Sequence, residues 1–454
     1  MDLRPNSDEA RDIAYHFHGY TNARAHEDQG PMIMDRGEGV YVFDTQGNRY
    51  IEGMSGLWSV AVGFHEERLI KAATQQMSKL PYYHNFAHRS HGPAIDLAEK
   101  LISLAPVSMS KVFFTNSGSE ANDTILKMLW YRSNSLGKPE KKKVISRIRG
   151  YHGVTIASAS MTGLPYNHAS FDLPIDGVLH TTCPHYWREG QEGESEEAFA
   201  TRCADDLDAM IQAEGPDTIA AFIAEPVMGA GGVVVPPATY WEKIQAVLAK
   251  YDILLIADEV ICGFGRTGNM FGCETFGITP DIMTMSKQIT SSYFPFSAFM
   301  MTEEVYAPIA DESGRIGVLG HGYTGGAHPV GAAVALENLK IIEERDLVTN
   351  AAERGAELQA GLRGFADHPL VGEARGVGLI GALEIIAPET HTDALKPGQL
   401  GLAMNKHFLK NGLISRNMLD AMAFCPPLIV TSDHVKDILS AVERSLEGFT
   451  AEMA

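Results

Sequence analysis

Short apolar runs alternate with amphipathic helical stretches through the middle of the chain. The helical stretches include SEANDTILKMLWYRSN and PPATYWEKIQAVLAKY, and the apolar runs include KVFFTN, TIAAFIAEPV, DILLIADEV, DIMTMSK and FSAFMMT. Continuous apolar strands separated by helices are typical of a mostly parallel sheet that is covered on both faces. The pattern therefore predicts a large α/β domain over residues 60–325.

The two ends of the chain show other patterns. GAAVALENLKIIEERDLVTNAAERGAELQAGLRGFAD has a 3.6-residue period and predicts one long helix or two. After it, VGEARGVGLIGALEI predicts antiparallel strands and GLAMNKHFLKNG a helix, so we expect a smaller α+β domain over residues 326–454. The early GVYVFDTQGNRYIEGMSG predicts a hairpin that turns at TQGN. We expect this N-terminal segment, residues 1–59, to pack with the small domain.

The composition of the chain argues against several classes of function. The chain has 454 residues and a net charge of −20, which argues against a nucleic-acid partner because such partners need a basic face. Five widely spaced cysteines without a C-x-x-C pair favour a reducing compartment over a disulfide framework or structural zinc. The start lacks the apolar core of a signal peptide, and no apolar run approaches about 20 residues. We therefore expect a cytoplasmic protein without a membrane partner.

Two motifs resemble binding sites but lack the context that such sites need. GFGRTG, residues 263–268, matches G-x-G-x-x-G, yet the NMFGCETFG that follows is a poor helix start, and a dinucleotide site needs those glycines to open a helix. HNFAHRSH contains His84, His88 and His91, of which His84 and His88 are four apart and could share a helix face as metal ligands. No third ligand or general-base glutamate lies nearby in a usable pattern. Ordinary loop residues are the better interpretation of both.

One lysine lies in a long segment that has no other basic residue. Lys287, in DIMTMSKQITS, is the only lysine or arginine between Arg266 and Arg315. A surface lysine at a loop edge would explain this. So would a nucleophile, because a desolvated amine is easier to deprotonate and can form a Schiff base.

A polar turn between a strand and a helix can bind an anion. In FFTNSGSEANDT a strand ends at Asn116, and Ser117, Gly118 and Ser119 open a helix. The free N–H groups and the dipole of a helix N-terminus favour a phosphate there, and Gly118 lets it approach the backbone. The alternative is an ordinary serine cap with Glu120 in the first turn.

Carboxylates and an aromatic ring follow two other strands. ILLIADEV ends in Asp258 and Glu259, at the strand end where α/β folds bind ligands. A buried carboxylate there needs a partner, such as a protonated ring nitrogen of a ligand. The alternative is a strand-end carboxylate that pairs with Arg266 or caps a loop. RGYHGVT places Tyr151 and His152 after a strand, where an aromatic ring can lie on a planar ligand.

These features fit one cofactor. A phosphate site, a strand-end carboxylate, an aromatic platform and a lone lysine are what pyridoxal 5′-phosphate (PLP) needs. Its aldehyde would take Lys287, its ring nitrogen Asp258, and its phosphate Gly118 and Ser119, with Thr324 of the Gly-rich loop HGYTGGAHP as a further donor.

The motifs TNSGSEAND, YHG, AEPV, DEVICGFGRTG and MSKQI, in this order, resemble those of class III aminotransferases. The resemblance covers nearly the whole chain, and GLWSVAVG and LISRNM make it most similar to pyruvate-dependent ω-transaminases. It implies the PLP-dependent fold type I, with a mostly parallel seven-stranded sheet in the large domain. It also implies a homodimer with active sites at the subunit interface, and whether dimers pair into tetramers stays open.

The resemblance also implies roles for single residues. Lys287 would form the Schiff base and shuttle the proton, and Asp258 would keep the pyridine nitrogen protonated. Tyr151 and Val260 would contact the two ring faces. The implied cofactor contacts are Ser117, Gly118, Ser119, Tyr151, His152, Glu225, Asp258, Val260, Lys287 and, from the partner subunit, Thr324.

The implied substrate pocket combines apolar and charged residues. Trp58, Tyr151 and, from the partner subunit, Phe86 would line it, and Arg416 would bind a substrate carboxylate. Where relatives that use ornithine or γ-aminobutyrate have a glutamate, EPVMGAGG has Ala230, which favours bulky apolar amines. Phe424 and Pro426 of FCPPLIV are expected near the same mouth.

The expected reaction moves an amino group from an amine or ω-amino acid to pyruvate, with pyridoxamine phosphate between the two halves. Two alternatives keep the scaffold: another class III PLP enzyme, such as a decarboxylase or aminomutase, and a catalytically idle PLP-fold binding module. A dehydrogenase rests only on the glycine motif at residues 263–268.

Overall fold

A seven-stranded sheet forms the middle of the computed structural model, which describes residues 4–388 and 395–453. One strand, β10, is antiparallel to both of its neighbours, the edge strand β4 and β9. All other neighbouring strands of this sheet are parallel. In spatial order the strands are β4 (Lys111–Thr115), β10 (Ser297–Met301), β9 (Ile282–Met285), β8 (Leu254–Asp258), β7 (Ile219–Ala224), β5 (Lys143–Arg147) and β6 (Val178–Thr181).

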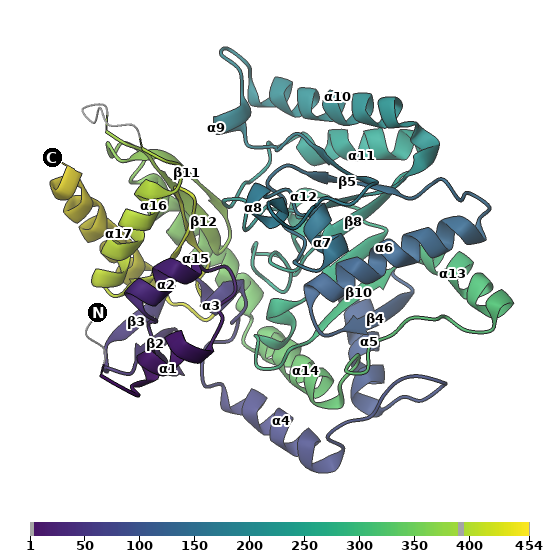
Figure 1. The fold of residues 1–454 in the computed structure, drawn as a ribbon, viewed down its shortest axis with the longest axis horizontal. Coiled ribbons are helices and arrows are strands. Elements are labelled where there is room, and N and C mark those ends of the chain that lie inside the picture. The colour runs from purple at the N-terminus through teal and green to yellow at the C-terminus, as the bar shows by residue number, and fades with distance from the viewer. Residues whose placement is uncertain (1–3, 389–394, 454) are drawn as a thin grey trace.

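Two apolar cores lie on opposite faces of this sheet, because successive side chains of a strand point to opposite sides. In β8, Leu255 and Ala257 belong to one core and Leu254 and Ile256 to the other. The first core includes α10 (Glu196–Glu214), α11 (Tyr240–Lys250) and α14 (Pro329–Glu344). The second includes α6 (Gly118–Ser135), α7 (Ile156–Met161) and α13 (Glu303–Ile316), and Figure 1 shows α10 and α11 on the side opposite α6.

Shorter helices and turns join these layers. α4 and α5 pack on α14, and α12 follows the strand that ends at Asp258. Their bounds, with those of the 3₁₀ turns η1 and η2, are α4 (Glu67–Lys79), α5 (Gly92–Leu104), α8 (Pro165–His168), α9 (Tyr186–Glu189), η1 (Pro216–Thr218), α12 (Gly272–Phe276) and η2 (Lys287–Thr290). The glycine motif at residues 263–268 forms turns before α12 begins, so it does not open a helix as a dinucleotide site would.

Two smaller sheets occupy the left of Figure 1. One is antiparallel, in the order β11 (Val371–Val377), β12 (Ile380–Ile385), β15 (Ala421–Phe424) and β14 (Arg416–Met418). The other joins the two ends of the chain, in the order β1 (Met34–Glu38), β2 (Tyr41–Asp44), β3 (Arg49–Glu52) and β13 (Leu413–Ile414). The helices of this part are α1 (Asp8–Tyr15), α2 (Ala23–Gln29), α3 (Ser55–Trp58), α15 (Leu347–Arg363), α16 (Gln399–Lys410) and α17 (Ser432–Met453).

The predicted N-terminal hairpin is confirmed, with its turn at TQGN. Tyr41 pairs with Ile51, and the carboxylate of Asp44 accepts the backbone N–H groups of Gln46 and Asn48, both at 2.9 Å. Gly47 takes a φ of +84°, which the turn requires. The strand β3 then pairs in parallel with β13, so the N-terminal segment is joined by a sheet to the C-terminal part.

The predicted α/β class with a mostly parallel seven-stranded sheet is confirmed. The long periodic stretch after residue 330 forms two helices, because the chain turns at Asp346, whose φ is +48°. The boundaries after residues 59 and 325 stay predictions. Within residues 4–388 and 395–453, no helix has the length and hydropathy that a bilayer crossing requires. All five cysteines are buried and free.

Candidate active site

Residues from five strand ends line one cavity. The carboxyl ends of parallel strands meet at one edge of a sheet, so the segments that follow β4, β5, β7, β8 and β9 converge there although they are far apart in sequence. The cavity is lined by Gly118, Ser119, Tyr151, His152, Gly153, Glu225, Asp258, Val260, Ile261, Ser286 and Lys287. Most of the proposed cofactor contacts are therefore brought together.

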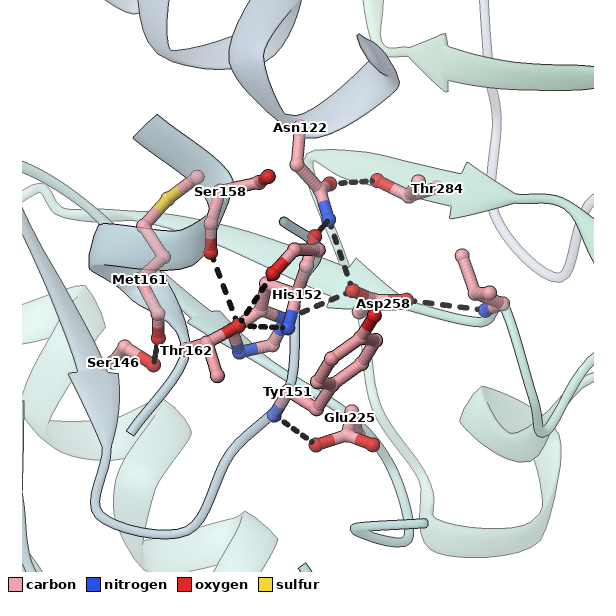
Figure 2. Close-up of polar contacts among 12 residues, drawn as sticks. Asn122, Ser146, Tyr151, His152, Ser158, Met161, Thr162, Glu225, Asp258 and Thr284 are labelled. Atoms are coloured by element: carbon pink, nitrogen blue, oxygen red, sulfur yellow. Dashed lines mark hydrogen bonds and ion pairs between the residues drawn. The ribbon is translucent and has the colours of Figure 1, made fainter. Parts of the chain in front are cut away.

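Asp258 is the most constrained group of this cavity. Its Oδ2 accepts hydrogen bonds from His152 Nδ1 at 2.8 Å and from Asn122 Nδ2 at 3.1 Å, as Figure 2 shows, and its Oδ1 accepts the N–H of Val260 at 3.2 Å. Thr284 donates to the Asn122 amide oxygen at 2.9 Å, which fixes the orientation of the amide. The carboxylate is 3% exposed, and the three hydrogen bonds that it accepts come from N–H donors.

Glu259, the next residue, has a different role. Its two carboxylate oxygens accept the N–H groups of Gly272 at 2.9 Å and Cys273 at 2.6 Å, at the start of α12. Burial raises the pKa of Glu259 to about 7. Arg266, the alternative partner of these carboxylates, instead donates to backbone oxygens, those of Leu379 and Pro426. Of the two strand-end carboxylates, Asp258 alone faces the cavity.

Glu225 holds the loop that carries the aromatic ring. Its Oε1 accepts the N–H of Tyr151 at 3.0 Å, and its Oε2 accepts that of Gly229 at 2.9 Å. Burial raises the pKa of Glu225, while the nearby His152 and Arg147 lower it. Burial also raises the pKa of the Tyr151 phenol, and the Tyr20 hydroxyl adds to this effect. Both side chains therefore favour their neutral forms more than in water.

Lys287 follows β9 in a strained backbone conformation. Its φ is +47°, in the left-handed region that costs a non-glycine residue about 1–2 kcal/mol. The next residue holds this turn, because the Gln288 amide donates to the carbonyls of Ile261 and Gly263, both at 2.9 Å. Asn338 donates to the Gln288 carbonyl at 2.7 Å from α14. The turn directs the lysine into the cavity.

The charge state of Lys287 is set by its surroundings. Burial lowers the pKa of the amine, Asp258 and Glu225 raise it, and the Arg416 guanidinium lowers it further. The net effect is a lowered pKa. The neutral amine is therefore more accessible than on a surface lysine, as a nucleophile requires.

The start of α6 forms a cradle with little room for side chains. A Cβ added at Gly118 would lie 3.3 Å from Val260 Cγ2, and one added at Gly153, whose φ is +135°, would lie 2.5 Å from the Ser119 hydroxyl. Ser117 is the N-cap and accepts the N–H of Glu120 at 3.2 Å, so its side chain serves the helix. The N-terminal dipole and close backbone approach suit a phosphate group.

A second, larger cavity lies beside the first. Arg416 and Met418 of β14 form one wall, Tyr166 and Phe171 another, and the loop 17–22, which includes Tyr20, a third. The sequence analysis missed Tyr20. An aromatic residue in an N-terminal loop carries no motif, and only the fold brings it near Tyr151.

Phe86 and Thr324 line neither cavity of their own chain. They lie in neighbouring loops: the Tyr82 hydroxyl donates to the Thr324 carbonyl at 2.9 Å, and a Cβ added at Gly322 would lie 2.6 Å from the Phe86 ring. Phe86 is 43% exposed. Their action in the partner subunit stays a prediction.

Trp58 and Phe424, which the sequence analysis expects in the substrate pocket or near its mouth, are both buried. Trp58 is 2% exposed and belongs to the apolar cluster that contains Ile261 of the first cavity and Met418 of the second. Phe424 is fully buried, with its ring centroid 5.8 Å from that of Phe408, and it lines neither cavity, so its place near the mouth stays a prediction. An alternating strand turns Phe424 into the core. Ala230 is partly buried and offers no polar side-chain group.

Comparison with known proteins identifies the family of this site. The profile of the family "Aminotransferase class-III" matches residues 22–446. The chain is 48% identical over 430 residues to the probable γ-aminobutyrate transaminase 3, mitochondrial, of Oryza sativa subsp. indica, covering 94% of this chain and 84% of that protein. It is 48% identical over 421 residues to the mitochondrial γ-aminobutyrate transaminase 1 of Solanum lycopersicum, covering 92% and 82%.

The chain belongs to the class III aminotransferases.

Solved structures agree with this. The ω-transaminase from Pseudomonas jessenii in complex with PMP is 60% identical, with a TM-score of 0.97 and coverage of 98% of this chain and 99% of that one. A thermostable ω-transaminase variant engineered for asymmetric synthesis of enantiopure bulky amines is 59% identical, with a TM-score of 0.97 and coverage of 99% and 100%. The protein is thus a PLP-dependent aminotransferase of fold type I, which acts on amine and keto substrates.

The cavity fits this cofactor. When bound, PLP supplies an electron sink that makes the substrate carbon acidic. The glycine cradle at the start of α6 would hold its phosphate, and the anionic Asp258 would pair with its protonated ring nitrogen. His152 Nε2 is buried without a partner among the described residues, while Nδ1 donates to Asp258, so the imidazole serves to orient the carboxylate.

Replacing Lys287 by Ala should leave the cofactor bound but abolish the absorbance band near the visible–violet boundary and transamination. The glycine cradle and Asp258 remain, whereas the amine that is expected to form the covalent link and to carry the proton is lost. Absorbance spectra and product assays measure both effects. The control is Lys250→Ala, which removes a surface lysine that pairs with Asp208. Turnover by the Lys287 variant would disprove the assigned role.

Replacing Asp258 by Asn should retain the cofactor but slow proton abstraction by roughly 10²-fold or more, because a neutral amide does not keep the ring nitrogen protonated. Single-turnover rates with a good amine donor measure this. Asp252→Asn, the same change at an exposed position ahead of β8, is the control. A rate equal to that of the control would contradict the role of Asp258.

Proposed function

We propose that the enzyme transfers an amino group from an amine or ω-amino acid to pyruvate. The observation that carries this proposal is the state of Arg416. Within residues 4–388 and 395–453 its guanidinium makes no hydrogen bond or ion pair, although it lines the larger cavity. Its positive charge acts on Lys287 and on the Tyr151 and Tyr166 phenols. An unpaired arginine beside the reacting amine is available to a substrate carboxylate.

The remainder of the cavity suits an apolar donor. Ile156, Tyr166, Phe171, Met418 and Leu419 line it, and aromatic and aliphatic surface favours an arylalkyl group. Ala230 offers no carboxylate that would tether Arg416. The bulky-amine transaminase described above carries a tryptophan-to-glycine substitution, which supports a substrate-facing role for Trp58 with Tyr151 and, from a partner subunit, Phe86.

The catalytic assignments follow from the geometry. We propose that Lys287 Nζ moves the proton at the substrate carbon, since its amine has a lowered pKa inside the cavity. His152 and Asn122 donate hydrogen bonds that orient the Asp258 carboxylate, and Glu225 positions the loop of Tyr151. We further propose that Gly118 and Ser119 hold the phosphate with Thr324 of the partner subunit, and that Val260 contacts the ring face opposite Tyr151.

γ-Aminobutyrate is the alternative donor within this proposal, because the curated relatives in rice and tomato bear that name. It carries its own carboxylate, so Arg416 would then bind donor and acceptor alike. An apolar amine would use Arg416 for the acceptor only. The two donors therefore differ in how the same arginine contributes to the first half-reaction.

Assembly and location belong to the proposal as well. We propose a homodimer in which Phe86 and Thr324 complete the partner's site, because their own chain leaves them outside both cavities. A tetramer of two such dimers is compatible with it. We place the enzyme in the cytoplasm, which suits five free cysteines, although the named plant relatives are mitochondrial.

Replacing Arg416 by Ala should raise the Michaelis constant for pyruvate strongly while leaving the half-reaction with an arylalkylamine nearly intact. The lost charge-assisted, bidentate contact should cost roughly 2–4 kcal/mol in the pyruvate half-reaction. Stopped-flow absorbance measures each half-reaction separately. If γ-aminobutyrate is the physiological donor, its half-reaction should be impaired to a similar extent.

The control for this variant is Arg315→Ala, which removes an arginine of α13 that pairs with Glu312 on the surface. It should change neither half-reaction. Equal impairment of the arylalkylamine and pyruvate half-reactions by Arg416→Ala would mean that Arg416 is structural and that another residue binds the carboxylate.

A further inference from the structure

Three imidazoles surround one carboxylate in the N-terminal segment. Asp12 Oδ1 lies 3.1 Å from His16 Nδ1, and Asp12 Oδ2 lies 2.7 Å from His18 Nε2 and 3.0 Å from His26 Nε2. The rings are also close to one another, with centroids 4.2 Å apart for His16 and His18 and 4.3 Å apart for His18 and His26. A carboxylate can accept several hydrogen bonds, but three imidazoles on one aspartate also gather several ring nitrogens, which are common metal ligands, around it.

The donor atoms have the spacing of a metal site. One ligand atom each of Asp12, His16 and His18 lies within 4.8 Å of the others. Bonds of about 2.0–2.1 Å place neighbouring ligands of a tetrahedral zinc ion roughly 3.3 Å apart. The carboxylate–imidazole distances of 2.7 and 3.1 Å, which run to different oxygens of Asp12, are close to this value. The three ligand atoms lie within 4.8 Å of one another, so these side chains would shift to surround an ion.

The cluster is partly shielded from water. The side chains of His26, Asp12 and His18 are 12%, 19% and 29% exposed, and His16 is 67% exposed, which leaves an open side for an ion to enter. Asp12 lies in α1, and His16 is the C-cap residue that follows the helix. His18 comes next in the loop, and His26 belongs to α2. The residues lie around a small surface hollow that His16, His18 and His26 line.

We propose that Asp12, His16 and His18 bind one divalent transition-metal ion, such as zinc. A ligand set of two imidazole nitrogens and one carboxylate suits zinc and other first-row transition metals, whereas calcium and magnesium prefer oxygen ligands. His26 donates to the same carboxylate from α2 and orients it, as histidine–carboxylate partners do around metal ions. Solvent takes the fourth position.

The site would act on the substrate cavity through the loop 17–22. This loop connects α1 to α2, begins beside His16 and forms one wall of the cavity that Arg416 lines. An ion that joins α1 to the loop would hold this wall, and Tyr20 with it. The role is structural, distant from the chemistry, and independent of the identity of the amine donor.

The test uses untagged holoenzyme that has been freed of metal with a chelator. Titration with Co²⁺ should give d–d absorption of a tetrahedral site at one ion per chain, and Zn²⁺ should displace the cobalt. His18→Ala and Asp12→Asn should abolish this binding, although the asparagine still accepts hydrogen bonds. His26→Ala should weaken it by about tenfold, as expected for a residue that orients a ligand.

His407→Ala is the matched control, because His407 pairs with a single carboxylate, Glu452 at 2.9 Å, elsewhere on the surface. It should bind cobalt as the wild type does. Retention of the cofactor absorbance and of the melting temperature without metal confirms that each variant folds. The proposal is wrong if the wild type binds no ion stoichiometrically, or if His407→Ala weakens binding as much as His18→Ala.

Discussion

The buried charge of Asp258 is the constraint on which the rest of the active site depends. A carboxylate removed from water costs several kcal/mol unless donors surround it. Here the donors come from three places: Asn122 of α6, His152 of the loop after β5, and the turn after β8 itself. Stabilising this anion therefore fixes the position of the helix that forms the phosphate cradle and of the loop that carries Tyr151.

A second constraint holds Lys287 opposite this carboxylate. The strained turn at Lys287 persists because buried amides of Gln288 and Asn338 bind the surrounding backbone. Arg266 donates to the Gln288 side chain at 3.2 Å and to carbonyls before β12 and after β15. The lysine turn is thus tied to the C-terminal sheet whose edge carries Arg416, so the reacting amine and the proposed carboxylate-binding group share one framework.

Three separate parts of the chain enclose the reaction space. The edge of the seven-stranded sheet provides its floor, β14 provides Arg416 and Met418, and the loop 17–22 provides Tyr20. The loop lies between two short helices with no buried residues, α1 and α2, and such peripheral elements open at low cost. An ion bound by Asp12, His16 and His18 would strengthen this wall of the cavity.

The sequence by itself determined the elements and much of the cofactor site. Strand-end residues such as Asp258 and Lys287 are predictable because the carboxyl ends of parallel strands converge at one edge of the sheet. The hydrophobic pattern did not show whether Asp258 or Glu259 faces the cavity. That is decided by the start of α12, whose backbone N–H groups bind the Glu259 carboxylate. Only the tertiary structure decided that Phe424 is core, that Trp58 is buried in one cluster with Ile261 and Met418, and that Tyr20 and three histidines gather near the larger cavity. These contacts join segments that are far apart in the sequence. They arise from packing between those segments, which the local hydrophobic pattern of each one does not reveal.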